Sequence, residues 1–92
     1  MLTNPQRNLL IEMKRGKLCH IWQSSRDIYI LVYDSYDSDE PTTVSLAPKG
    51  TRTVIKSLQR KGFIDHDQRL GVNYYFVTIE GEEALGTYIR ER

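Results

Sequence analysis

Basic and hydrogen-bonding side chains recur at helical spacing in the centre of this 92-residue chain. With about 100° of rotation per residue, they occupy one side of a helix predicted over residues 48–61, while Val54, Ile55 and Leu58 face the opposite side. We call this side the basic stripe, and it consists of Lys49, Arg52, Thr53, Lys56, Gln59 and Arg60. Lysine and arginine neutralise phosphates, while arginine, glutamine and threonine can hydrogen-bond base edges. The stripe favours binding of double-stranded DNA, although a solvated helix face has the same composition.

The net charge of +1 hides blocks of opposite sign. Residues 41–64 hold five basic side chains and no acid, whereas residues 34–40 hold four acids and no base. Residues 1–33 carry a charge of +3 and residues 65–92 a charge of −3. Such blocks create local fields even where the total cancels. We call residues 34–40 the acidic loop, and the sequence leaves open whether it covers the basic stripe or points away from it.

The elements around the stripe can be predicted from caps and from alternating apolar residues. Thr3 and Gln6 form a capping box before a helix over residues 4–15, with Gly16 as its C-cap. Short strands are expected over residues 18–22, 28–33 and 42–46. This arrangement leaves no helix between the first helix and the stripe.

The second half of the chain is predicted to form a helix, a β-hairpin and a second helix. Pro48 suits the first turn of the central helix and Gly62 ends it. Two strands, at 63–64 and 74–77, are joined by a loop over residues 65–73. Thr78 caps a last helix, whose apolar side consists of Ala84, Leu85, Tyr88 and Ile89. The fold class is α+β, and 92 residues suffice for a single domain.

Three segments resemble the winged-helix DNA-binding proteins, particularly the MarR-like and small phage-type members. They are Leu2–Leu10, Thr53–Ile64 and Tyr75–Gly81, the last of which contains Thr-x-x-Gly. The resemblance implies a winged-helix-like domain over residues 1–92, with three helices, a small antiparallel sheet and a β-hairpin wing. The chain departs from the family where a supporting helix is expected before the recognition helix.

The resemblance also implies a function for the matched positions. The basic stripe would face the major groove or its phosphates, and Arg69 near the hairpin tip would reach a minor groove or the backbone. The chain would then be a DNA-binding transcriptional regulator or a small accessory protein. The apolar side of the C-terminal helix either packs on the first helix or pairs with its copy in a homodimer, which would match two half-sites.

A second hypothesis from the same residues is a protein-interaction module without enzymatic activity. The acidic loop and exposed sheet edges would contact a partner protein, as in a phage-type inhibitor or adaptor. The missing supporting helix and the four acids of residues 34–40 motivate this alternative.

Other chemistry is not expected from the sequence. Cys19, His20 and His66 lack the spacing of a metal site, so no metal or cofactor is predicted. Cys19 is expected to be a core residue and His20 a packing residue that shares a strand face with Trp22. The longest apolar run, residues 28–33, is too short for a membrane span. With a single cysteine and no apolar leader at the first residues, we expect a cytoplasmic protein.

Overall fold

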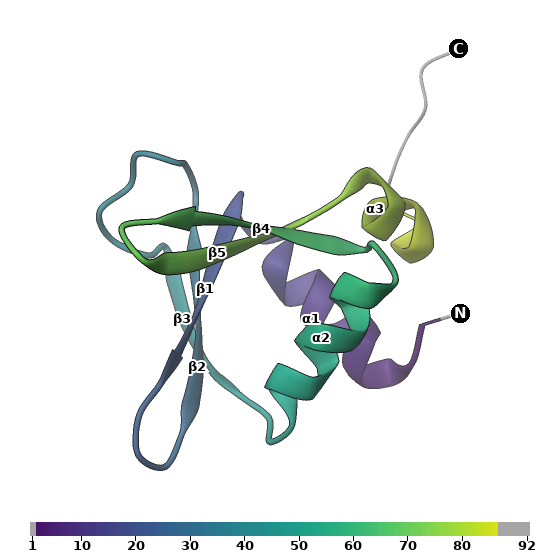
Figure 1. The fold of residues 1–92 in the computed structure, drawn as a ribbon, viewed down its shortest axis with the longest axis horizontal. Coiled ribbons are helices and arrows are strands. Elements are labelled where there is room, and N and C mark those ends of the chain that lie inside the picture. The colour runs from purple at the N-terminus through teal and green to yellow at the C-terminus, as the bar shows by residue number, and fades with distance from the viewer. Residues whose placement is uncertain (1, 87–92) are drawn as a thin grey trace.

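A five-stranded antiparallel sheet with helices on one face forms the frame of the protein (Figure 1). A computed structural model describes residues 2–86. The elements are α1 (Asn4–Met13), β1 (Leu18–Gln23), β2 (Ile28–Tyr33), β3 (Thr43–Ala47), α2 (Thr51–Arg60), β4 (Ile64–Arg69), β5 (Val72–Val77) and α3 (Ile79–Leu85). The strand order is β3-β2-β1-β5-β4. The predicted α+β class is confirmed for the described residues, with three helices.

The sheet is larger than the sequence predicts. Residues 28–33 of β2 pair with β1 and β3 on either side, which makes a three-stranded unit. The hairpin β4–β5 joins this unit where Cys19 of β1 pairs with Tyr75 of β5. The expectation of a small sheet is therefore wrong, because a contact between residues far apart in the chain merges the two units. Three strands, and no helix, lie between α1 and α2, as expected.

The core lies between the sheet and the helices. Its buried cluster consists of Leu9, Leu10, Met13, Cys19, Ile21, Ile30, Val32, Ile55, Leu58 and Ile64. Cys19 and Ile21 alternate with His20 and Trp22 along β1, so the first pair faces the helices and the second pair faces away. Cys19 has no exposed surface, which confirms it as a core residue.

Local chemistry explains where α1 begins and ends. The Thr3 hydroxyl accepts a hydrogen bond from the Gln6 amide at 3.3 Å, and the Gln6 side chain accepts one from the Thr3 amide at 3.0 Å. This confirms the capping box. The helix ends at Met13 with Lys14 as C-cap, so the prediction of Gly16 as C-cap is wrong. Gly16 instead packs against β2, where a Cβ would lie 2.5 Å from the Tyr33 carbonyl oxygen.

The central helix is shorter than predicted at its start. Gly50 stands at the N-cap with a φ of 84°, a conformation that glycine adopts without strain. Pro48 therefore precedes the helix, and the prediction that it occupies the first turn is wrong. Gly62, with a φ of 76°, follows the C-cap Lys61 and confirms the predicted end.

The hairpin β4–β5 has a tight turn in place of the predicted nine-residue loop. Strand β4 runs to Arg69 and β5 starts at Val72, so only Leu70 and Gly71 connect them. Both residues have positive φ values, 50° and 79°, which is the geometry of a type I′ turn. The loop prediction for residues 65–73 is wrong because β4 is an edge strand whose residues after Ile64 are exposed and polar.

The last described helix is fixed to the sheet by Thr78 and Gly81. The Thr78 hydroxyl accepts a hydrogen bond from the Gly81 amide at 3.1 Å, which confirms the predicted cap, and donates one to the Gly62 carbonyl at 2.6 Å. A Cβ on Gly81 would collide with the carbonyl oxygen of Phe63. Leu85 packs against the core cluster, and Tyr88 and Ile89 lie outside the described residues.

Candidate nucleic-acid interface

Helix α2 presents two chemically different sides. Thr51, Ile55 and Leu58 are buried against the core. A hydrogen bond of 3.1 Å from the side-chain Nε2 of Gln6 to the Ser57 hydroxyl ties the helix to α1. The opposite side is therefore held outward by packing on both α1 and the sheet.

The basic stripe lies on this outward side. Lys49, Arg52, Thr53, Lys56 and Arg60 are exposed, and Gln59 is half-buried. No ion pair among residues 2–86 involves a cation of the stripe. Uncompensated cations on one rigid helix create a positive potential that attracts polyanions. This is the electrostatic arrangement that a phosphate backbone requires.

The first turn of α2 strengthens the attraction for anions. Gly50 has no side chain to cap the helix, and the first turn contains no acidic residue. The amide groups of this turn point along the helix axis and carry a partial positive charge. Lys49 and Arg52 add two full charges beside them. The start of the helix is thus suited to contact a phosphate group.

Arg52 connects the stripe to the β1–β2 hairpin. Its Nε atom donates a hydrogen bond of 2.8 Å to the Gln23 side-chain oxygen at the end of β1. The guanidinium is oriented by this contact, while its other nitrogen atoms have no hydrogen-bond partner among the described residues. An arginine held in this way loses less side-chain entropy when it binds a phosphate.

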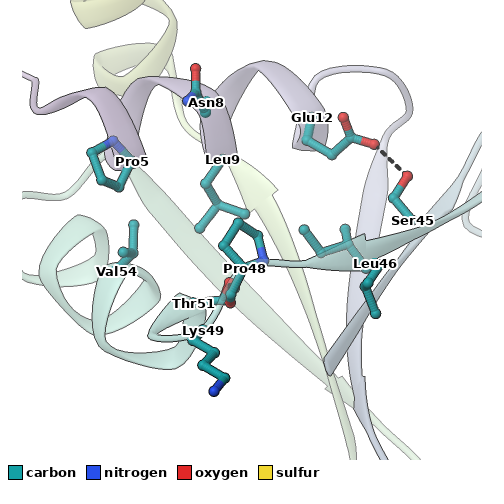
Figure 2. Close-up of a pocket in the computed structure, with 11 residues that line it drawn as sticks. Pro5, Asn8, Leu9, Glu12, Ser45, Leu46, Pro48, Lys49, Thr51 and Val54 are labelled. Carbon is teal, nitrogen blue, oxygen red and sulfur yellow. Dashed lines mark hydrogen bonds between the residues drawn. The ribbon is translucent and has the colours of Figure 1, made fainter. Parts of the chain in front are cut away.

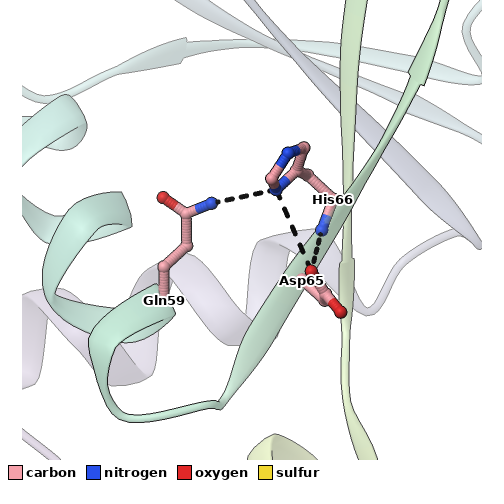
Figure 3. A network of polar contacts seen from close by, with 3 residues as sticks. All are labelled: Gln59, Asp65 and His66. Carbon is pink, nitrogen blue, oxygen red and sulfur yellow. Dashed lines mark hydrogen bonds and ion pairs between the residues drawn. The ribbon is translucent and has the colours of Figure 1, made fainter.

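Gln59 connects the other end of the stripe to β4 (Figure 3). Its side-chain nitrogen lies 3.4 Å from Nδ1 of His66, and the same ring nitrogen lies 3.9 Å from the Asp65 carboxylate. The Asp65 carboxylate also accepts the His66 amide at 2.8 Å. Gln59 is therefore positioned between the helix and the hairpin rather than extended into solvent.

Arg69 does not join the stripe. Its guanidinium donates to the Tyr36 carbonyl at 2.8 Å, lies 5.1 Å from the Tyr36 ring centroid and pairs with Asp67 at 3.3 Å. The tip of the hairpin, at the left of Figure 1, lies apart from α2 and beside the loop before β3. Arg69 thus lies against the acidic loop.

The contact between Arg69 and Tyr36 places the acidic loop beside the tip of the β4–β5 hairpin. Tyr36 belongs to the loop, and its two contacts with Arg69 anchor the loop at the tip of β4–β5. The four carboxylates of the loop form no ion pair among residues 2–86. The basic stripe is therefore not neutralised by the loop.

Sequence reasoning did not identify Gln23, His66 and Tyr36 as neighbours of the predicted site residues. Each belongs to a different element from its partner, and the contact depends on how β1, β4 and the acidic loop meet α2 or the hairpin tip. No local pattern in the sequence carries that information.

A pocket of about 340 Å³ lies between α1, the end of β3 and the start of α2 (Figure 2). Pro5, Leu9, Ile30 and Val54 give it a mostly apolar wall. The Glu12 carboxylate on its rim accepts a hydrogen bond of 2.8 Å from Ser45 and lies 3.4 Å from Arg15. Because this carboxylate already has two partners, it is not free to orient a ligand in the pocket.

The Cys19 thiol serves packing in the core. Burial raises the pKa of the Cys19 thiol to about 12, and the nearby Glu12 carboxylate contributes to the increase. A thiol with such a pKa is a poor nucleophile at neutral pH. No group of three His, Cys, Asp or Glu side chains within residues 2–86 could hold a metal ion. None of the helices in this part of the chain is long and apolar enough to cross a membrane.

Comparisons with known proteins add no family assignment. No protein-family model, curated protein or solved structure matches the chain.

Proposed function

We propose that the protein binds double-stranded DNA through the basic stripe, as a transcriptional regulator or a small accessory protein. The observation that carries the proposal is the set of four exposed cations on and next to α2 that no carboxylate among residues 2–86 neutralises. Lys49 and Arg52 would contact phosphates near the helix start, and Lys56 and Arg60 would contact them further along. Thr53, exposed between them, is available to a base edge.

The scaffold proposed for this activity is winged-helix-like with a changed support. In a helix-turn-helix the recognition helix rests on the helix before it. Here α2 rests on α1 through Gln6 and Ser57, and it follows strand β3 directly. The contacts of Arg69 with Tyr36 and Asp67 argue against a phosphate contact at the hairpin tip. The proposed interface therefore depends on the helix and not on the wing.

Fluorescence anisotropy with a labelled DNA duplex tests the proposal. At low salt we expect the Lys56→Ala/Arg60→Ala variant to bind at least about tenfold more weakly than the wild type, because two phosphate contacts are lost. The Arg15→Ala/Lys17→Ala variant is the matched control, since it removes the same charge from the segment between α1 and β1. Equal losses in the two variants would indicate a general charge effect and would refute the assignment to the stripe.

A second candidate function is a protein-interaction module that uses the acidic loop. It is favoured by the four loop carboxylates, which have no cationic partner among residues 2–86 although Tyr36 holds the loop in place. We expect a pull-down to recover one stoichiometric basic protein, and the Asp37→Asn/Asp39→Asn/Glu40→Gln variant to lose it. A partner retained by the neutralised loop would contradict this function.

A further inference from the structure

The face of the sheet that points away from α1 and α2 is apolar where a solvated face is normally polar. Strand register places Trp22, Tyr29 and Leu46 in one row across β1, β2 and β3, and His20, Leu31 and Val44 in the next row. We call the five residues other than His20 the outer patch. The rings of Trp22 and Tyr29 lie 5.5 Å apart between centroids. An antiparallel sheet with one solvated face usually carries polar residues on it.

The outer face of the sheet is exposed at the end that holds the outer patch and buried at the other end. Along β1, Leu18 is 3% exposed and Trp22 is 50% exposed, although both face away from the helices. On the edge strand β3, Val44 is 59% and Leu46 is 65% exposed. Contiguous apolar surface of this kind marks an interaction site.

Charge at the two ends of the patch is of opposite sign. Strand β1 starts at the end where the acidic loop connects β2 to β3, because Leu18 pairs with Tyr33. It finishes at the end where Arg26 lies in the β1–β2 turn and Lys49 follows β3. The first end carries the four acids of residues 34–40 against Lys17 and Arg69, and the second end carries Arg26 and Lys49 against Asp27. The surface is therefore complementary to itself when it is reversed end to end.

We infer that the outer patch is a homodimer interface in which two copies pack sheet against sheet with their strands antiparallel. A two-fold axis along the strands would bring two acidic loops together and is disfavoured by repulsion. An axis across the strands places each acidic loop against the basic end of the other copy. Sheets packed in this way lie about 10 Å apart, with apolar side chains between them.

The available area suits a reversible dimer. Strands of about six residues with about 4.8 Å between them give the three-stranded patch a footprint of roughly 15 by 20 Å. The acidic loop and the β1–β2 turn extend it toward the roughly 800 Å² per partner that specific complexes bury. Helix α2 lies across the opposite face of the sheet (Figure 1), so Arg52, Lys56 and Arg60 stay accessible, and Lys49 is the stripe residue that the two interfaces would share.

Sedimentation equilibrium of the full chain tests the inference. We expect the mass to rise from 10.8 kDa toward twice that value at concentrations up to about 1 mM. Leu46→Lys should raise the dissociation constant by about 100-fold, because a dimer loses two buried leucines and gains two apposed charges. Ile11→Lys is the matched control, since Ile11 is 49% exposed on α1, and it should leave the constant unchanged.

Fluorescence supplies a second readout at the centre of the patch. Trp22 is the single tryptophan of the chain, so its emission should shift to shorter wavelength as the concentration rises, and Leu46→Lys should remove the shift. A wild type that remains monomeric, a dimer unaffected by Leu46→Lys, or Trp22 emission independent of concentration would each overturn the inference. A dimer that strengthens with added salt would do so as well, because it would bring like charges together.

Discussion

Alkaline pH tests the burial of Cys19 quantitatively. The thiol has an ordinary pKa of 9.0, which applies to the unfolded chain, and a pKa of about 12 in the folded protein, where it has no exposed surface. Between these values the unfolded state binds fewer protons than the folded state, so stability falls as the pH rises. The loss begins near the unfolded pKa and ends near the folded one.

The size of the effect follows from linkage. At about pH 10.5 the unfolded thiol is ionised and the folded thiol is not, which lowers the free energy of unfolding by about 2 kcal/mol relative to about pH 8. The pKa of Tyr33 is also raised, by burial and then by Tyr74 and Cys19, so the wild type alone does not isolate the thiol.

Urea unfolding of the wild type and of Cys19→Ala at both pH values separates the two groups. Cys19→Ala should be less stable at neutral pH because it leaves a small cavity. Between about pH 8 and about pH 10.5, however, its free energy of unfolding should fall by about 2 kcal/mol less than that of the wild type. Identical pH dependence in the two proteins would refute the argument that the folded core excludes the thiolate.

Three further substitutions test the packing and the hairpin tip. Leu58→Ala, at a position with no exposed surface, should lower the free energy of unfolding by about 2–5 kcal/mol in urea titrations. Gly81→Ala should cost about 1–3 kcal/mol and lower the melting temperature, because the new methyl group meets the Phe63 backbone. Arg69→Ala should leave DNA affinity within about twofold of the wild type, because the guanidinium of Arg69 already contacts the carbonyl and the ring of Tyr36. A loss of affinity as large as that of a stripe variant would contradict this assignment.

The sequence predicts those elements whose signals are local. The capping box of Thr3 and Gln6 depends on residues three apart, and the strand at 28–33 depends on alternation along its own length, so both are confirmed. Strand β4 lacks such a signal because, after Ile64, its side chains are polar and exposed at the sheet edge. The sequence predicts the start of α2 at residue 48 because proline is compatible with a first helical turn. The helix instead starts at Thr51, because Gly50, with its positive φ, is the N-cap.

The residues of the candidate site can be predicted from the sequence, but the contacts that they make with other elements cannot. Helical periodicity places Lys56 and Arg60 on the side opposite Leu58, and both are exposed. The contact of Arg52 with Gln23 and that of Arg69 with Tyr36 join residues 29 and 33 positions apart. Contacts over such separations depend on the assembled sheet, and no local pattern encodes them.

The salt dependence of duplex DNA binding tests the central claim most directly. Four phosphate contacts, from Lys49, Arg52, Lys56 and Arg60, predict that log K falls with log salt at a slope of about −3.6. The Lys56→Ala/Arg60→Ala variant should show a slope of about −1.8. A slope that is the same in the variant and the wild type, or a wild type that does not bind duplex DNA at low salt, would contradict the account.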